Sequence, residues 1–404
     1  MKTAVFSLFI ASLTAFITSS VFAGGIDNKH NYSTEYVRTL NRNAATDSAD
    51  AAVYNPAGVL RMKDGFYLNL SAQEAFKDYW HTAAGAEYKS DTPSFIPGLF
   101  GLYKQDKWAA YGALSIVAGG GKVEYDQGSA TTMAIGNAII ARSGGFYSNI
   151  RNQRLEADSI YFGYTIGGAY EVNDRVSLSL GLRYVDAGKE ARGSVTVSGL
   201  APDMTAQMDY EQAADGWGGI VGLNLSPASD INIGIRYETR TKLDFETRLK
   251  RDDTGILADG AKQRHDLPAL FGLGVAYNIR PDIMIEADFT YYLNENADWN
   301  GVENKVDNGY DLGICIEYLF SPRFKGSLGY IYTRTGINPD DMTPEAPELD
   351  AHTIGGGFCY EAARNLNLNF GILRAFYNED TTSSGMTLNK KVLIISMGIQ
   401  YKFF

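Results

Sequence analysis

The chain has 404 residues, with 47 acidic against 36 basic ones and a formal net charge of −11 at pH 7. This acidic balance argues against nucleic acid as a partner. The mean hydropathy of −0.19 resembles that of a soluble protein, and after residue 23 no stretch approaches the roughly 20 apolar residues that a membrane helix needs.

Residues 1–23 are predicted to be a secretory signal peptide. Lys2 is followed by an uncharged stretch over residues 3–22, and residues 21–23 read Val-Phe-Ala, with small residues at the positions that a signal peptidase reads. The alternative is a retained transmembrane helix, but no basic residue directly follows the stretch to stop its transfer. We expect the mature chain to begin at Gly24.

Residues 24–64 show no strand-like alternation. Small and polar residues dominate positions 44–60, and Asn-Pro-Ala-Gly at 55–58 marks a turn. A barrel follows this segment, and its lumen would otherwise be open to water. We therefore interpret the segment as a plug. A flexible periplasmic tail is the alternative.

Residues 65–404 alternate between strand-like segments and two kinds of connection. Residues 231–237 show the pattern best, with apolar side chains at odd positions against Asn232, Gly234 and Arg236. The short polar connections are residues 105–107, 172–175, 226–230, 279–282, 321–323 and 362–365, whereas the others are long loops. Short turns on one side and long loops on the other are typical of a membrane β-barrel, although a secreted β-sandwich is an alternative.

Fourteen strands are predicted, an even number that keeps both chain termini on the short-turn side. They are residues 65–77, 93–103, 107–118, 155–171, 174–197, 210–226, 229–247, 265–279, 282–294, 306–320, 323–335, 350–361, 365–378 and 389–404. Several exceed the roughly 9–11 residues that cross a bilayer. These strands are expected to project beyond the membrane on the loop side.

The chain ends in alternating aromatic residues, Tyr401, Phe403 and Phe404. They resemble the C-terminal signal that the outer-membrane assembly machinery reads, and they also suit the aromatic girdle of a barrel. Cys315 and Cys359 fall on the inward faces of the tenth and twelfth strands. Strands two apart are about 10 Å from each other, so we expect free thiols.

Residues 43–58 closely resemble the hatch segment of the long-chain fatty acid transporter (FadL-type) family of outer membrane proteins, which also includes aromatic hydrocarbon uptake channels. The segment carries that family's motif at Asn55, Pro56 and Ala57. Residues 216–245 look like the family's sixth and seventh strands, and residues 266–270 like the start of its eighth.

The resemblance implies a monomeric, fourteen-stranded antiparallel transmembrane barrel in the outer membrane of a Gram-negative bacterium, plugged by an N-terminal hatch. It also implies passive uptake of a hydrophobic ligand, such as a fatty acid, a hydrocarbon or a detergent-like molecule. In that family the ligand leaves sideways, through a kink in the third strand, into outer membrane lipids. Gly119, Gly120 and Gly121, after the third predicted strand, are the candidates for the kink, although an ordinary loop start also explains them.

The longest loop follows this strand and contains an apolar stretch of helical length, with Met133, Ile135, Ile139 and Ile140. These side chains are candidates for the ligand groove, and a helix packed on the barrel rim is the alternative. Family members that bind fatty acids place basic groups at an internal site. Arg192 is the candidate for that role. Neutral hydrocarbons remain alternative ligands, because no second basic residue is securely placed.

The rival functions are a general porin, a structural outer membrane protein without a hydrophobic substrate, and an outer-membrane enzyme. None of the chain's four histidines, at positions 30, 81, 265 and 352, lies in a recognisable nucleophile motif. The inward carboxylates of Glu286 and Asp288 are explained by a polar lumen. We therefore predict no catalysis, no metal site and no cofactor.

Overall fold

The computed structural model describes residues 31–404. The predicted signal peptide, its cleavage point and residues 24–30 lie outside the described residues. In the described part, no helix is both long and apolar enough to cross a membrane.

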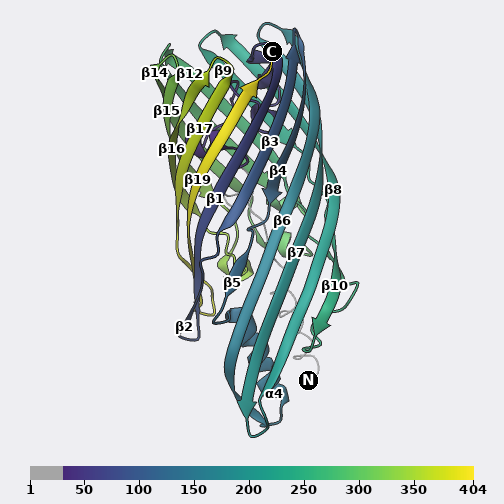
Figure 1. Cartoon of the computed structure of the whole chain (residues 1–404). Coiled ribbons are helices and arrows are strands. Elements are labelled where there is room, and N and C mark those ends of the chain that lie inside the picture. The colour runs from purple at the N-terminus through teal and green to yellow at the C-terminus, as the bar shows by residue number, and fades with distance from the viewer. Residues whose placement is uncertain (1–30) are drawn as a thin grey trace.

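The described chain forms a closed antiparallel β-barrel of fourteen strands (Figure 1), which confirms the predicted fold class. Closure comes from pairing of the first strand, β1, with the last, β19, over residues 67–82 and 387–402. The strands that cross the wall are β1 (Gly65–Ala83), β3 (Ser94–Gln105), β4 (Trp108–Ala118), β6 (Tyr147–Asn173), β7 (Val176–Gly199), β8 (Met204–Ala228), β9 (Ile231–Glu238), β12 (Ala269–Arg280), β13 (Ile283–Leu293), β14 (Gly309–Ser321), β15 (Phe324–Arg334), β16 (Ala351–Ala363), β17 (Leu366–Tyr377) and β19 (Thr387–Lys402).

Shorter elements lie at the loop end and inside the barrel. The short strands are β2 (Ala86–Ser90), β5 (Val123–Tyr125), β10 (Asp244–Asp252), β11 (Lys262–Arg264) and β18 (Asp380–Thr381). The helices are α2 (Thr34–Thr39), α3 (Ala51–Tyr54) and α4 (Ala130–Arg142), with 3-10 turns η2 (Gly58–Arg61), η3 (Asn294–Asn296), η4 (Val302–Lys305) and η5 (Pro339–Asp341).

Period-two alternation separates an apolar outer face from a polar lumen. Leu180 on β7 and Leu328 on β15 point outward and are 68% and 58% exposed, whereas Arg183 on β7 is buried in the lumen. A soluble sandwich would bury the apolar face instead. The distribution is that of a barrel whose outer wall faces hydrocarbon.

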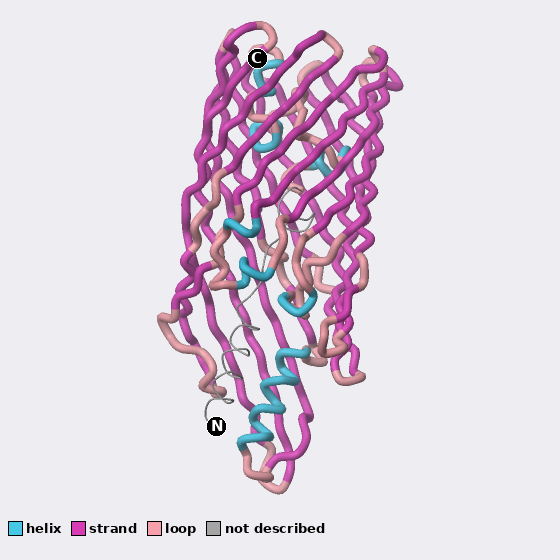
Figure 2. Tube along the Cα trace, turned by 180° about the vertical axis from the view of Figure 1, so that it is seen from behind, coloured by secondary structure: helices cyan, strands magenta, loops and turns pink. Residues whose placement is uncertain are grey.

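The two ends of the barrel differ, as the connection lengths predicted. Short turns lie at the end that holds the C-terminus, and β6, β7 and β8 extend far beyond the other strands at the opposite end, where α4 lies (Figures 1 and 2). Several predicted strand boundaries were wrong. β1 ends at Ala83 rather than 77, and β8 begins at Met204 rather than 210. β6 begins at Tyr147 rather than 155, because it pairs with the whole of β7, and the predicted strand 229–247 divides into β9 and β10, joined by residues 239–243.

Residues 31–64, which we call the hatch, lie inside the barrel (Figure 2). Its helix α2 packs against β16, β17 and β19, far away in the sequence. The Ser33 side chain caps this helix by accepting from the Tyr36 N–H and donates to Asp50, which links its start to the next turn of the hatch. Tyr36 and Tyr54 stack with ring centroids 5.6 Å apart.

Glycines of the wall let the hatch backbone approach closely. A Cβ at Gly329 would overlap the carbonyl oxygen of Thr39, and a Cβ at Gly234 would overlap that of Asn43. Because only glycine lacks this atom, the wall can contact the hatch main chain directly at both positions. Other wall glycines in close contact with the hatch are Gly98, Gly274 and Gly313.

Charged pairs also join the hatch to the wall. Arg38 pairs with Glu317 on β14, and both side chains are buried. The exposed Asp47 lies 2.8 Å from the ammonium of the half-buried Lys325 on β15. Because an unpaired buried charge is costly, the Arg38–Glu317 pair favours one position of the hatch in the lumen.

Candidate functional site

The wall is interrupted between β3 and β4. Their pairing reaches only as far as Ser115 opposite Gly98, while residues 94–97 of β3 stay paired with β1 on their other side. After Ala118 the chain leaves β4, passes through three glycines and resumes as β5, which pairs with β6. No ladder hydrogen bonds close the wall between residues 94–97 and this segment in the described structure.

The three glycines have different roles. Gly119 and Gly121 have φ angles of 99° and 66°, which residues with a side chain rarely adopt. A Cβ at Gly119 would also overlap the backbone oxygen of Ser159. Gly121 donates its N–H to the same oxygen at 3.0 Å. A Cβ at Gly120 would meet no atom within 4 Å. Gly119 and Gly121 therefore shape the turn, and Gly120 faces open space.

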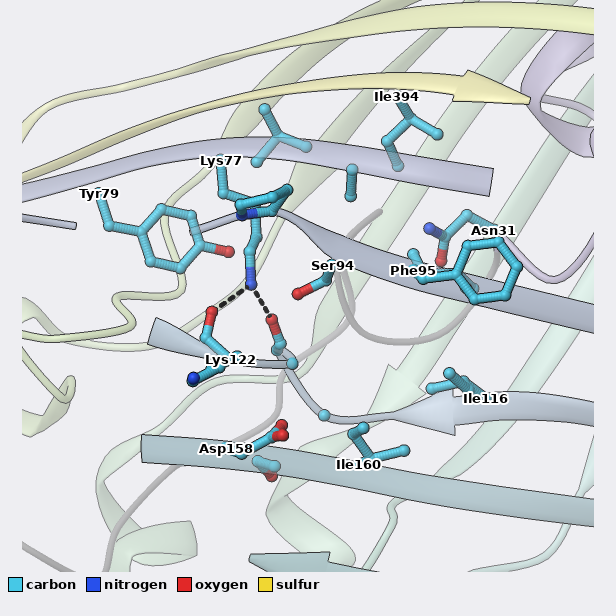
Figure 3. A pocket seen from close by; sticks show the side chains of 18 residues that line it. Asn31, Lys77, Tyr79, Ser94, Phe95, Ile116, Lys122, Asp158, Ile160 and Ile394 are labelled. Carbon is cyan, nitrogen blue, oxygen red and sulfur yellow. Dashed lines mark hydrogen bonds between the residues drawn. The ribbon is translucent and has the colours of Figure 1, made fainter. Parts of the chain in front are cut away.

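A cavity of about 270 Å³ lies at this interruption (Figure 3). Lumen-facing residues line one part of it, among them Ile96 on β3 and Ile394 on β19. Outward-facing Phe95, Ile116 and Ile160 line another part. Because alternate residues of a strand point to opposite faces of the sheet, this cavity is bordered by residues from both faces of the wall.

The lining is mostly apolar but has a few polar groups. Lys77 of β1 donates to the carbonyl oxygens of Gly120 at 2.6 Å and Lys122 at 2.9 Å (Figure 3). Among the described residues, the buried side-chain atoms without a hydrogen-bond partner include Ser94 Oγ, Asp158 Oδ1 and Asn31 Nδ2, all in residues that line this cavity. The site suits an apolar body with a small polar group, since buried polar atoms favour a partner.

The Asn55 side chain joins the hatch to the wall away from this cavity. Its amide nitrogen donates to the Ala45 carbonyl at 3.1 Å and to Asn224 Oδ1 on β8 at 2.8 Å, while its oxygen accepts from the Gly58 N–H at 3.2 Å. The next two residues of the motif also touch the wall. The Ala57 carbonyl accepts from Ser177 on β7 at 2.9 Å, and a Cβ on Gly222 would press on the Pro56 ring.

Solved structures of the same architecture are numerous. A Pseudomonas aeruginosa FadL homologue aligns with a TM-score of 0.70 at 15% identity, covering 95% of this chain and 100% of the other. The P. putida toluene transporter TodX gives 0.67 at 16% identity, covering 89% and 96%, and the Ralstonia pickettii toluene transporter TbuX gives 0.65 at 15% identity, covering 91% and 99%.

The chain has the fold of these proteins. At 15–16% identity the likeness extends to the architecture alone. No protein-family model matches the sequence, and no curated protein matches it.

Helix α4 carries the predicted apolar groove residues and packs on the inner face of the extended strands β6, β7 and β8. Ile135 is buried against β7 and β8, and the space left between them is only about 10 Å³. The Met133 sulfur accepts a hydrogen bond from Tyr88 at 3.4 Å, and Ile139 and Ile140 are half-buried. The packed-helix alternative describes this arrangement, and a ligand role for the four side chains stays a prediction.

The structure does not bring Arg192 to the lumen, so that placement was wrong. Arg192 lies on the outer face of β7, where its side chain is 53% exposed and 3.4 Å from Asp209. The lumen-facing basic residues of this strand are Arg183 and, nearer to Arg192, Lys189, whose ammonium lies 4.5 Å from the Phe245 ring centroid. The positions of Lys189 and Arg192 differ by three residues, an odd number, so alternation sends their side chains to opposite faces.

Two groups of lumen residues have roles that sequence reasoning did not assign. Lys77 was missed, although its odd position on β1 matches those of inward polar Asn69 and Gln73. The carboxylate of Glu286 accepts from the Ala44 N–H at 2.8 Å, and that of Asp288 accepts from two further hatch N–H groups. These acids hold the hatch backbone.

The C-terminal aromatics lie at the short-turn end. Phe403 donates its N–H to the Phe66 carbonyl at 2.9 Å, and the two rings are 5.2 Å apart. Tyr401 and Phe404 are exposed on the outside. These contacts suit an aromatic girdle, and their role as an assembly signal stays a prediction.

The described residues contain no group of three or more His, Cys, Asp or Glu side chains that could hold a metal ion. Cys315 on β14 and Cys359 on β16 are separated by β15 and are free thiols.

Proposed function

We propose that this barrel lies in the outer membrane of a Gram-negative bacterium and passively takes up hydrophobic compounds, either long-chain fatty acids or related hydrocarbons. The ligand leaves through the cavity between β3 and β4 into the membrane. The observation that carries this proposal is a cavity lined by residues of both faces of the wall. Transport of this kind needs no catalytic group.

Partitioning provides the driving force. Each methylene kept out of water is worth about 0.8 kcal/mol, so a hydrophobic ligand gains by entering lipid hydrocarbon directly. The hatch fills the lumen beside the short-turn end with buried residues such as Tyr54 and Asn55. A sideways exit avoids both the hatch and the water beyond it.

The named structural neighbours support the chemical class of the ligand. Two are toluene transporters, and a third is a FadL homologue. Because these likenesses concern architecture, the substrate of this chain is inferred from its own cavity. Its predominantly apolar lining, with Ile96, Ile116, Ile160 and Ile394, suits a hydrophobic molecule.

Gly120→Trp tests the exit directly, because a side chain at Gly120 meets open space and needs no backbone change. We expect the variant to assemble normally and to lose uptake of long-chain or aromatic compounds into proteoliposomes. The matched control is Gly101→Trp, an outward position on β3 where a Cβ also meets no atom within 4 Å. Uptake that survives Gly120→Trp would refute the proposed route.

Single-channel conductance separates this function from that of a general porin. A barrel filled by its hatch should conduct ions hardly at all, whereas a porin conducts steadily. Arg192→Ala should leave uptake unchanged, since this side chain lies outside the barrel.

A further inference from the structure

Lys77 spans the interruption in the wall. Its backbone belongs to β1, yet its ammonium donates to two carbonyl oxygens of the segment that follows β4. β3 lies between these two strands in the sheet. Lys77 lies two positions beyond Ala75, the β1 residue that pairs with Ser94 at the start of β3. Its side chain therefore reaches across the wall just beyond the part of β3 whose ladder hydrogen bonds to β4 have ended.

Burial gives this contact its strength. Lys77 is 5% exposed, and a buried ammonium is costly unless hydrogen bonds offset its desolvation. The Gly120 and Lys122 carbonyls supply two such bonds, of the charge-assisted kind that is stronger than a neutral pair. Further along the segment, Ser90 Oγ accepts from the Glu124 N–H at 2.9 Å, so that end is fixed separately.

The part of the segment that precedes Glu124 borders the cavity. Gly119, Gly120, Gly121 and Lys122 all line it, together with Lys77 itself. The position of these backbone atoms therefore sets how far the segment lies from Phe95 and Ile96 on the other side of the opening.

We propose that Lys77 is a positioning residue that holds the Gly120–Lys122 segment across the wall opening and thereby limits the width of the molecules that pass. Its charge serves the wall rather than an anionic ligand. The consequence for ligand width rests on the proposed function, whereas the contact with the segment does not.

The first test is hydrogen–deuterium exchange of purified full-length protein, followed in peptides covering residues 119–123. Lys77→Met keeps an unbranched side chain but removes the donors. We expect exchange in this segment to become at least about tenfold faster, because both charge-assisted hydrogen bonds to its carbonyls are lost. Lys77→Arg, which keeps charge and donors, should restore protection.

The control variant is Lys390→Met. Lys390 is another buried lumen lysine, on β19, and its ammonium lies 4.4 Å from the Tyr377 ring centroid. This variant should leave exchange of residues 119–123 unchanged. Equal acceleration in both variants would overturn the proposal, because it would indicate general loosening of the barrel. Should Lys77→Met fail to assemble, Lys77→Gln provides the same comparison with a smaller expected increase.

The second test measures uptake of n-decane and of its bulkier bicyclic relative decalin into proteoliposomes. Lys77→Met should raise the ratio of decalin to n-decane uptake relative to the native protein. Unchanged exchange with selective loss of decanoate uptake would overturn the proposal and assign Lys77 to carboxylate binding. Failure of Gly120→Trp to block uptake would instead refute the exit route, leaving the exchange result to judge Lys77.

Discussion

Replacing Asn55 by alanine should loosen the hatch without preventing barrel assembly. The Asn55 side chain is fully buried, and its amide makes three hydrogen bonds: two within the hatch, to Ala45 and Gly58, and one to Asn224 on the wall. Alanine removes all three. The wall network persists in part, because Asn224 Oδ1 also accepts from Asn232 at 2.9 Å.

The size of the effect follows from these bonds. Each neutral hydrogen bond contributes about 0.5–1.5 kcal/mol net, so three contribute roughly 2–4 kcal/mol, reduced where water enters the space left by the amide. A loss of about 2 kcal/mol raises the population of locally opened hatch roughly 30-fold, since 1.4 kcal/mol is a factor of ten. Barrel strands should be unaffected, because local opening does not require global unfolding.

Hydrogen–deuterium exchange measures this directly. Peptides covering residues 43–58 should exchange roughly 30-fold faster in Asn55→Ala, and ion leakage through planar bilayers should increase, while heat-modifiable migration on gels stays native. Asn149→Ala is the control, because Asn149 is exposed and its amide donates only to the neighbouring Ser148 hydroxyl, at 3.0 Å, in the described structure. Native exchange of residues 43–58 in Asn55→Ala would refute the reasoning and leave the motif as an inert turn.

Two further variants test other contacts of the same barrel. Gly329→Val should displace the hatch and increase ion leakage, because a Cβ there overlaps the carbonyl oxygen of Thr39; conductance equal to that of the native protein would show that the hatch does not pass this glycine. Deleting residues 403–404 removes the Phe403 N–H bond to Phe66 and part of the aromatic girdle, and should lower the yield of heat-modifiable protein in outer-membrane fractions, whereas a native yield would argue against an assembly signal.

Local patterns in the sequence predicted most features of the barrel. Residues 231–237 alternate, and in the structure Arg236 faces the lumen while Tyr237 faces outward. The side-chain period of a strand is a property of two successive residues, so it can be read without knowing any partner. Short turns and long loops are equally local, which is why the strand number and the two unlike ends followed from the sequence.

Strand boundaries and side-chain roles depended on contacts between residues far apart in the sequence. Lys189 and Arg192 are three positions apart, and β7 pairs with β6 and β8 without a bulge over both of them. Lys189 therefore stays on the lumen face and Arg192 on the outer face. The N-terminal extension of β6 also exists because β7 is present to pair with it.

The sequence identified the three glycines at 119–121 as a possible kink, but it did not show that they have different roles. Whether each φ is positive, and whether a Cβ meets Ser159 or open space, is decided by how β6 packs beside them. The hydrogen bonds from Lys77 to the Gly120 and Lys122 carbonyls join residues more than forty positions apart. Such contacts form only when barrel closure brings distant strands together, so tertiary structure alone determines them.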